Sequence, residues 1–306
     1  MLKIQNQKFI FKKFWEKIFK LPKNHRYQGV PEIILTSFYL SIMVILVRDL
    51  GKDYHIFFIV MMRNIFGAIF LIPKFIKHQK SLFNSKNIYL HFLRSANGTA
   101  SMFLWFYAIV LLPISEAISL SFLTPLITTL ASSFFLKEKV NKNIFIACFV
   151  SFVGVLIILR PGFNEFKIGY IFCFGSILLW TLSNLMVKTM TKTDKTRNIV
   201  AQMTIYMLIF SIPFAIPYIK PINFIGIIKF IIIGFLSNQC YRLIAQAYKK
   251  NDLAVLQPFD FTRLIFASFM AYLFFNETPD LLVFVGSLVI LLGIIIGLRK
   301  QKKPLQ

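Results

Sequence analysis

Long apolar stretches alternate with short polar connections along nearly all of the 306 residues. Each stretch holds roughly 20 predominantly apolar residues, the length that an α-helix needs to cross the hydrocarbon core of a bilayer. Because lipid offers the backbone no hydrogen-bond partner, such a stretch must be helical. The stretches cover residues 31–50, 56–74, 90–111, 114–136, 143–160, 168–188, 198–219, 222–248, 253–276 and 280–298. The pattern predicts an all-α membrane protein with ten transmembrane helices.

The composition agrees with this pattern and excludes two other classes of protein. Hydrophobic residues make up 57% of the chain, more than a soluble protein of this length could bury. The net charge of +23 would suit a nucleic-acid-binding protein, but the basic residues lie in the tails and between the apolar stretches, so no basic domain remains. Cys148, Cys173 and Cys240 lie far apart within apolar stretches and predict neither a disulfide framework nor a metal site.

The charges in the connections predict the orientation of the chain. If the N-terminus is cytoplasmic, the basic residues in the opposite connections are Arg48, Lys52, Arg160, Lys167, Lys220 and Lys229. Most of the 35 lysines and arginines then lie in cytoplasmic connections and tails, as the positive-inside rule requires. We expect a multi-pass protein of the cell inner membrane with both termini in the cytoplasm. Residues 1–30 form a basic cytoplasmic tail, either solvated or lying on the membrane as an interfacial helix, and residues 299–306 form a second basic tail.

The two halves of the chain resemble each other at one spacing. At 139 residues the matching pairs are Ala108 with Ala247, Glu138 with Glu277, and Gly154 with Gly293. The segment LVRDL (46–50) matches MVKTM (186–190) at a spacing of 140. Each half has five apolar stretches, an odd number, so the second half must cross the membrane in the opposite sense. We expect two inverted five-helix repeats, residues 31–160 and 168–298, with a substrate site between them near the middle of the membrane.

Residues 92–140 carry a family resemblance. The features that match are Arg94, Phe106–Tyr107–Ala108, Leu112–Pro113, Glu116–Ala117, Pro125 and Glu138, and in the second half Ala247, Pro258 and Glu277. With these features the chain resembles the EamA-like family of the drug/metabolite transporter superfamily over roughly residues 31–298. The resemblance implies a ten-helix carrier of five plus five spans with a central cavity, but no particular substrate. The segment Gln257–Arg263 (QPFDFTR) departs from the commonest pattern of the family, because it places an aspartate and an arginine where many relatives carry a proline slightly further on.

Charged residues inside the apolar stretches are the candidate substrate-binding residues. A charge at the bilayer centre costs about 2.5–3.5 kcal/mol on insertion scales, and Arg63, Asp260 and Arg263 lie near the middle of their stretches. Asp260 and Arg263 are three residues apart and can share one helix face. There the two charges either neutralise each other, or Asp260 fixes the position of Arg263 so that it can bind a substrate anion. Arg94, a further candidate, lies near a cytoplasmic end together with Arg242, where both side chains can snorkel to the interface.

Counting Arg63 and Arg263 against Asp260 leaves one positive charge, which favours a substrate with a carboxylate or another anionic group. Aromatic side chains supply the remaining candidates. Trp105, Tyr107, Trp180 and Tyr241 can line a cavity or lie at the membrane interface. Glu116 lies near a span end, where it can cap its helix.

The sequence shows no P-loop, GxGxxG or GxSxG motif, and its four histidines are expected in connections or at span ends, so we expect no ATP site, cofactor, metal site or catalytic centre. We interpret the chain as a secondary transporter that moves a small, carboxylate-bearing or zwitterionic metabolite by alternating access. Its partners are the substrate and the lipid bilayer, and a homodimer is left open. The alternatives are an uptake carrier for a nucleoside cofactor such as S-adenosylmethionine, a membrane-embedded enzyme, and a lipid flippase or non-transporting scaffold.

Overall fold

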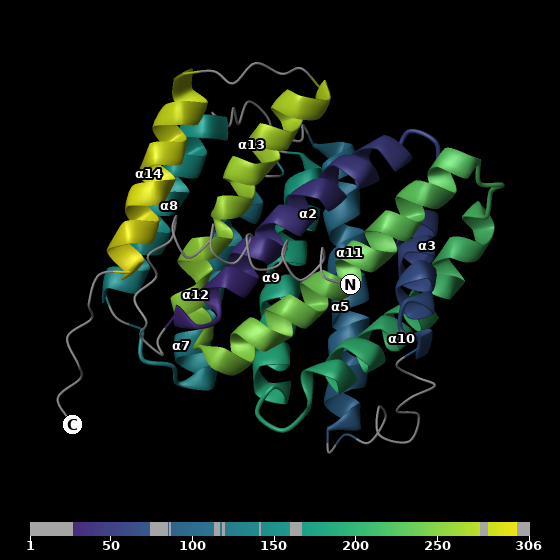
Figure 1. Cartoon of the computed structure of the whole chain (residues 1–306), viewed down its shortest axis with the longest axis horizontal. Coiled ribbons are helices and arrows are strands. Elements are labelled where there is room, and N and C mark those ends of the chain that lie inside the picture. The colour runs from purple at the N-terminus through teal and green to yellow at the C-terminus, as the bar shows by residue number, and fades with distance from the viewer. Residues whose placement is uncertain are drawn as a thin grey trace, which may run out of the picture.

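The computed structural model describes residues 27–73, 85, 87–112, 117, 120–140, 142–159, 167–275 and 281–298, and all regular structure in these residues is helical (Figure 1). The first half contributes α2 (Val30–Leu50), α3 (Ile56–Ile69), α5 (Ile88–Leu111), α7 (Leu123–Leu136) and α8 (Lys142–Leu159). The second half contributes α9 (Ile168–Met190), α10 (Thr196–Ala215) with the short η2 (Ile216–Tyr218), α11 (Phe224–Lys250), α12 (Leu253–Asp260), α13 (Thr262–Phe275) and α14 (Leu281–Leu298). With α12 and α13 taken as one broken span, the described residues contain the predicted ten helical segments, five in each half.

The lengths of the helices reflect where polar groups enter the spans. Among the described residues, four segments are long and apolar enough to cross a membrane by length and composition alone: Val30–Leu50, Ile168–Met190, Thr196–Tyr218 and Phe224–Lys250. Helices α3 and α7 each have 14 residues. Helix α5 has 24 residues, but polar side chains interrupt its apolar pattern in the middle. The interfacial helix suggested for the N-terminal tail, and the connections around Pro113 and Glu277, lie outside the described residues.

Helix boundaries repeat between the halves at the spacing that the sequence predicts. Helices α7 and α13 begin at Leu123 and Thr262, and α8 and α14 begin at Lys142 and Leu281. Both pairs are 139 residues apart, and the ends of these helices keep the same spacing. The turns after α2 and after α9 also share their backbone hydrogen bonds, because Tyr54 N–H donates to Leu50 O and Asp194 N–H donates to Met190 O, 140 residues later.

The contacts between helices also repeat when each helix is replaced by its counterpart in the other half. Helix α5 packs against α9 and α10, and its counterpart α11 packs against α2 and α3, which are the counterparts of α9 and α10. Likewise α7 packs against α9, and α13 packs against α2. Two further contacts join counterparts directly, α3 with α10 and α8 with α14, and α7 also packs against α12 of the other half. In Figure 1 the α8–α14 pair lies at one edge of the molecule and α3 and α10 lie toward the other. The fold is therefore two inverted five-helix repeats around an approximate two-fold axis.

Small residues allow α8 and α14 to approach closely at one end of this axis. A Cβ atom on Gly154 would lie 2.7 Å from the carbonyl oxygen of Gly286. A Cβ atom on Gly293 would lie 2.8 Å from the carbonyl oxygen of Ala147 and 2.1 Å from Ser151 Oγ. Gly154 corresponds to Gly293, and Ala147 corresponds to Gly286. The contact of Gly154 with Gly286 is therefore equivalent to the contact of Gly293 with Ala147, as in a two-fold symmetric interface.

This close approach predicts a stability effect. Gly293→Ala should lower the melting temperature of the detergent-purified protein, because the added methyl group would overlap backbone and side-chain atoms of α8, and overpacking of this kind costs about 1–3 kcal/mol. Gly175→Ala is the matched control, since its Cβ would meet only the flexible end of Leu104 at 3.2 Å. Equal melting temperatures for the two variants would show that α8 and α14 do not pack as described.

Candidate functional site

Two arginines and a tyrosine from three helices meet between the halves of the chain. Arg63 of α3 donates from Nη2 to the hydroxyl oxygen of Tyr241 of α11 at 2.8 Å. The guanidinium carbons of Arg63 and of Arg94, in α5, lie 5.7 and 5.5 Å from the centre of the same tyrosine ring. All three side chains are buried, with exposed fractions of 7%, 3% and 7% for Arg63, Arg94 and Tyr241. The fold thus brings together three of the candidate residues.

Neutral groups hold this cluster in place. Asn64 Oδ1 accepts from Arg63 Nη2 at 2.9 Å, while Asn64 Nδ2 donates to the carbonyl oxygen of Met207 at 3.2 Å. The Met207 sulfur lies 3.5 Å from both Arg94 Nη1 and the hydroxyl oxygen of Tyr241. Helix α10, which carries Met207, therefore supports a cluster whose charged members come from α3 and α5. The sequence analysis did not select Asn64 or Met207.

The charge of the two arginines is not neutralised within the described part of the chain. Neither Arg63 nor Arg94 forms an ion pair with a described carboxylate, and Arg94 Nε is buried without a hydrogen-bond partner there. An intramembrane arginine costs about 2.5–3.5 kcal/mol on insertion scales, and two close together also repel each other. A carboxylate or phosphate would accept hydrogen bonds from the planar guanidinium donors and remove this repulsion. The cluster therefore has the chemistry of an anion-binding site.

The second charged group lies where the ninth span is broken. Helix α12 ends at Asp260 and α13 begins at Thr262, so Phe261 lies between them. Arg263 Nη2 is 3.8 Å from Asp260 Oδ2, longer than a hydrogen bond, and the side chains are 24% and 26% exposed. The guanidinium carbon of Arg263 also lies 5.1 Å from the centre of the Phe122 ring. The predicted pair is formed, and its long distance leaves the donors of Arg263 available to another acceptor.

Phe122 and Phe261 mark matching breaks in the two halves. They are 139 residues apart, their exposed fractions are 1% and 0%, and their rings stack with centroids 5.6 Å apart and planes at 16°. Phe122 forms the turn directly before α7, as Phe261 does before α13. The sequence analysis missed both residues, although the repeat spacing pairs them. Broken helices at a repeat interface are the elements from which transporters build substrate sites.

We call Arg63, Arg94, Tyr241, Asp260 and Arg263 the central site. Three arginines against one aspartate leave two positive charges, one more than the sequence analysis counted, because it did not include Arg94. Tyr248, two helical turns after Tyr241 on α11, lies within electrostatic reach of both Arg94 and Asp260.

The other aromatic candidates lie elsewhere. Tyr107 contacts the rings of Phe57 and Phe172, with centroids 5.6 and 6.0 Å away. Trp105 packs partly buried against the apolar cluster that contains Ala108 and Cys173. Trp180 of α9 is also partly buried. Within the described residues, none of these three side chains forms a hydrogen bond, ring contact or cation–π contact with the arginines of the central site.

Two expectations about depth are resolved by the structure. The expectation that Arg94 snorkels to the interface is wrong, because its side chain turns inward onto Tyr241 and is 3% exposed. Arg242, the neighbour of Tyr241, is exposed and lines a surface pocket, as a snorkelling residue would. Glu116 lies outside the described residues, so its suggested capping role stays a prediction.

A third group of polar residues, the Glu138 network, joins α7, α9, α11 and α12 at the end of the molecule where α2 begins. The Glu138 carboxylate accepts from the backbone N–H groups of Leu253 and Ala254 at 2.9 and 3.1 Å, which caps the first turn of α12. Lys188 of α9 lies 3.8 Å from the same carboxylate and donates to the carbonyl oxygen of Tyr248 at 2.8 Å. Glu138 carries part of the family resemblance, and its contact with the opposite half gives it a physical role.

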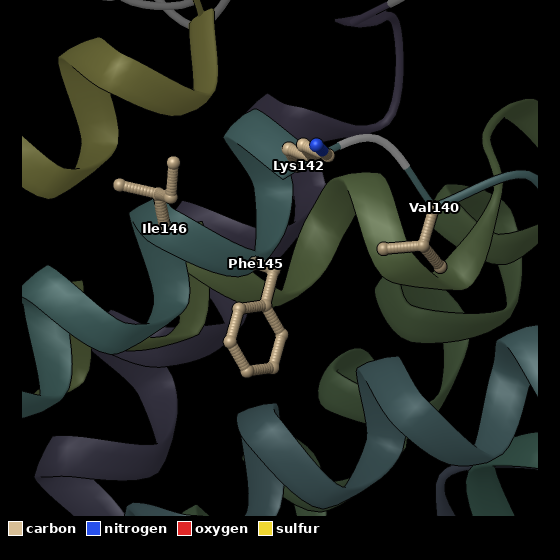
Figure 2. Close-up of a pocket in the computed structure, with 4 residues that line it drawn as sticks. All are labelled: Val140, Lys142, Phe145 and Ile146. Atoms are coloured by element: carbon tan, nitrogen blue, oxygen red, sulfur yellow. The ribbon is translucent and has the colours of Figure 1, made fainter.

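Two pockets lie at the surface of the described residues. A pocket of about 380 Å³ is lined by Val140, Lys142, Phe145 and Ile146 at the start of α8 (Figure 2). Another, of about 230 Å³, is lined by Thr196, Arg197, Val200, Arg242 and Gln246. Neither pocket contains a residue of the central site, whose arginine–tyrosine cluster is buried. The described residues also contain no cluster of three histidine, cysteine or acidic side chains that could hold a metal ion.

The fold and the buried charges define a multi-pass helical membrane transporter built from inverted repeats. The profile of the EamA-like transporter family matches residues 28–160 and again residues 167–299. The chain belongs to this family, which consists of transporters and not enzymes.

Similar proteins include an S-adenosylmethionine uptake transporter of Rickettsia bellii, 23% identical over 90% of this chain and 95% of the relative. A riboflavin transporter of Vibrio cholerae is 27% identical over 67% of this chain and 69% of the relative. A pseudopaline exporter of Pseudomonas aeruginosa is 22% identical over 90% and 97%. A solved crystal structure shares the fold with a TM-score of 0.76 at 15% identity and covers 89% of this chain and 96% of its own.

Proposed function

We propose that this protein is a gradient-driven secondary transporter that moves a carboxylate-bearing, zwitterionic metabolite by alternating access between its two halves. The observation that carries the proposal is the contact of Arg63 and Arg94 with one tyrosine ring, with no described carboxylate to neutralise them. The substrate carboxylate replaces the missing anion and accepts from the guanidinium donors. Asp260, at the broken span, offers a negative charge to the ammonium or other cationic group of a zwitterion.

The relatives favour one substrate class within this proposal. S-Adenosylmethionine has an amino-acid carboxylate, an ammonium group, a sulfonium and an adenine ring. Arg63 and Arg94 match the carboxylate, and Asp260 matches a cationic group. The similarity to S-adenosylmethionine uptake transporters over 90% of the chain supports this candidate. Uptake of such a nucleoside cofactor is therefore our second, narrower candidate.

The test of the proposal is solute exchange in proteoliposomes. Vesicles containing the purified full chain, loaded with unlabelled solute, should take up the same labelled solute from a panel of S-adenosylmethionine, amino acids, riboflavin and pseudopaline. We expect exchange with a carboxylate-bearing zwitterion and none with vesicles that lack protein. Redistribution of a labelled phospholipid between leaflets, without flux of any solute, would instead support the flippase alternative.

The orientation belongs to the proposal as well. The distribution of basic residues supports an inner-membrane protein with both termini in the cytoplasm. Reporter fusions after Lys195 should therefore read cytoplasmic and fusions after Phe163 periplasmic. The opposite readout at both positions would reverse the assignment.

The Asp260–Arg263 pair gives a prediction of its own. Arg263→Lys should reduce transport per inserted molecule several-fold, although the charge is kept, because lysine lacks the planar fork of donors. Asp260→Asn should also weaken transport, because it removes the charge that holds Arg263 beside Phe122. Exposed Phe134 and Phe224 provide control substitutions to leucine. Wild-type transport by both Arg263→Lys and Asp260→Asn would make the pair structural.

A further inference from the structure

A histidine and an aspartate form a buried pair outside the central site. His91, in the first turn of α5, is 0% exposed, and Asp194, in the turn between α9 and α10, is 7% exposed. His91 Nε2 lies 2.7 Å from Asp194 Oδ2, and Ser85 Oγ donates to the same oxygen at 2.7 Å. The sequence analysis placed His91 at a span end and gave it no role. The structure agrees with the span-end position and places His91 one helical turn before Arg94.

The hydrogen bond fixes which histidine nitrogen is free. An ionised aspartate can only accept, so Nε2 of a neutral His91 must carry the hydrogen and donate to Asp194. Nδ1 then holds the lone pair, and it is buried without a hydrogen-bond partner among the described residues. Nδ1 is therefore the atom that takes up a proton. On protonation the pair changes from one negative charge to neutral.

The other half of the molecule makes the corresponding contact without an ionisable pair. His91 corresponds to Phe230 at the 139-residue spacing, and Asp194 corresponds to Tyr54 at the 140-residue spacing of the turns. Phe230 and Tyr54 are buried, with exposed fractions of 0% and 6%, and their rings are in contact at 5.5 Å between centroids. A neutral aromatic pair is thus sufficient to join the turn to the helix that packs against the two helices beside that turn. Tethering alone does not explain why the first of these contacts is titratable.

The charges around His91 connect it with substrate binding. On α5 itself, Arg94 lies within electrostatic reach of His91, and Asp194 is the other charged group that acts on it. Of the helices packed against α5, α3 carries Arg63, which faces Arg94 and Tyr241. Helix α9 carries Lys188, which donates to backbone carbonyls of the Glu138 network, and α10 carries Arg197, which lines the surface pocket with Arg242.

We propose that His91 and Asp194 form the binding site of the coupling proton, so that this carrier is a proton symporter. The proposal rests on the function proposed above. A proton at Nδ1 cancels the negative charge of Asp194 beside Arg94, which favours a substrate carboxylate at the arginine–tyrosine cluster. By linkage, a bound carboxylate raises the affinity of His91 for the proton by the same factor. Proton and substrate therefore bind together and move in the same direction.

The experiment separates accumulation from exchange in proteoliposomes. The labelled probe is S-adenosylmethionine, or whichever of the panel solutes wild type exchanges. An acidic outside buffer should drive wild-type uptake above equilibration, up to about tenfold for a gradient of one pH unit if one proton moves with each solute and the membrane potential is clamped at zero. His91→Gln keeps an amide donor for Asp194 but cannot titrate. It should lose this accumulation and still exchange solute at equal pH, at a reduced rate because the charge of Asp194 beside Arg94 is no longer cancelled.

A second variant copies the neutral half of the molecule. The double substitution His91→Phe and Asp194→Tyr should also exchange without accumulating, and His55→Gln, at the opposite end, is the control that should accumulate like wild type. Accumulation by His91→Gln, or no response of wild type to the pH gradient, overturns the proton site while leaving the transporter function intact. Loss of exchange in both His91 variants makes the pair structural and also overturns it. Absence of wild-type exchange with every solute refutes the proposed function itself.

Discussion

Arg94→Gln and Arg63→Gln are each expected to lower the initial rate of transport about 10- to 100-fold. Each substitution removes a charge-assisted contact with the substrate anion, and hydrogen bonds to charged groups contribute about 1.5–3 kcal/mol. Arg94→Lys should fall between glutamine and wild type, because it keeps the charge and loses the planar donors. The measurement is the initial rate per inserted molecule in proteoliposomes.

Arg242→Gln is the matched control for these variants. Arg242 follows Tyr241 in the chain, but its side chain is exposed and lines a surface pocket with Thr196 and Gln246. Its loss should leave the rate within about twofold, as substitutions of exposed charges usually do. If Arg94→Gln transports as fast as Arg242→Gln, the arginine–tyrosine cluster does not bind the substrate.

The second large effect is expected from Glu138→Ala, which should destabilise the folded protein by about 3–5 kcal/mol. The substitution removes the acceptor for the N–H groups of Leu253 and Ala254 and leaves the half-buried Lys188 without its nearest buried carboxylate. Glu138→Gln should cost less, because the amide oxygen can still cap α12. The measurement is thermal unfolding in detergent, together with the yield of monodisperse protein.

Asp252→Asn controls for the charge of the same network. Asp252 lies 3.7 Å from Lys188, but its side chain is 61% exposed. Exposed pairs contribute about 0–1 kcal/mol, so little change is expected. A melting temperature of Glu138→Ala equal to that of Asp252→Asn would show that the cap and its ion pair do not hold α7 and α12 together.

The fold could be predicted from the sequence because membrane crossing leaves a strong, local signal. Apolar stretches of the right length had to become helices, and an odd number of spans in each half required inversion. The breaks at Phe122 and Phe261 left no such signal. These breaks depend on how α7, α12 and α13 pack between the halves, and the hydrophobic pattern does not predict that packing. Only the 139-residue spacing relates the two phenylalanines.

The central site could be predicted in part. Intramembrane charge singled out Arg63, Asp260 and Arg263, because its cost is a property of the sequence. The position of Arg94 near a span end led to the wrong expectation for its side chain. A side chain near a span end can turn toward the helix bundle as well as toward the membrane interface. Tyr241 lies 178 residues after Arg63, so their contact arises only when α11 packs against α3. His91 meets Asp194 for the same reason, 103 residues apart.

The measurement that tests the central claim most directly compares two competitors that differ by one carboxylate. Proteoliposomes exchange labelled S-adenosylmethionine, or the panel solute that wild type prefers, against excess of the same solute or of its decarboxylated form. If Arg63 and Arg94 bind the carboxylate, the intact solute should compete at least about tenfold better with wild type, a difference of about 1.4 kcal/mol. This preference should disappear in the residual exchange of Arg94→Gln. Equal competition by the two forms with wild type would contradict carboxylate recognition by the arginine–tyrosine cluster.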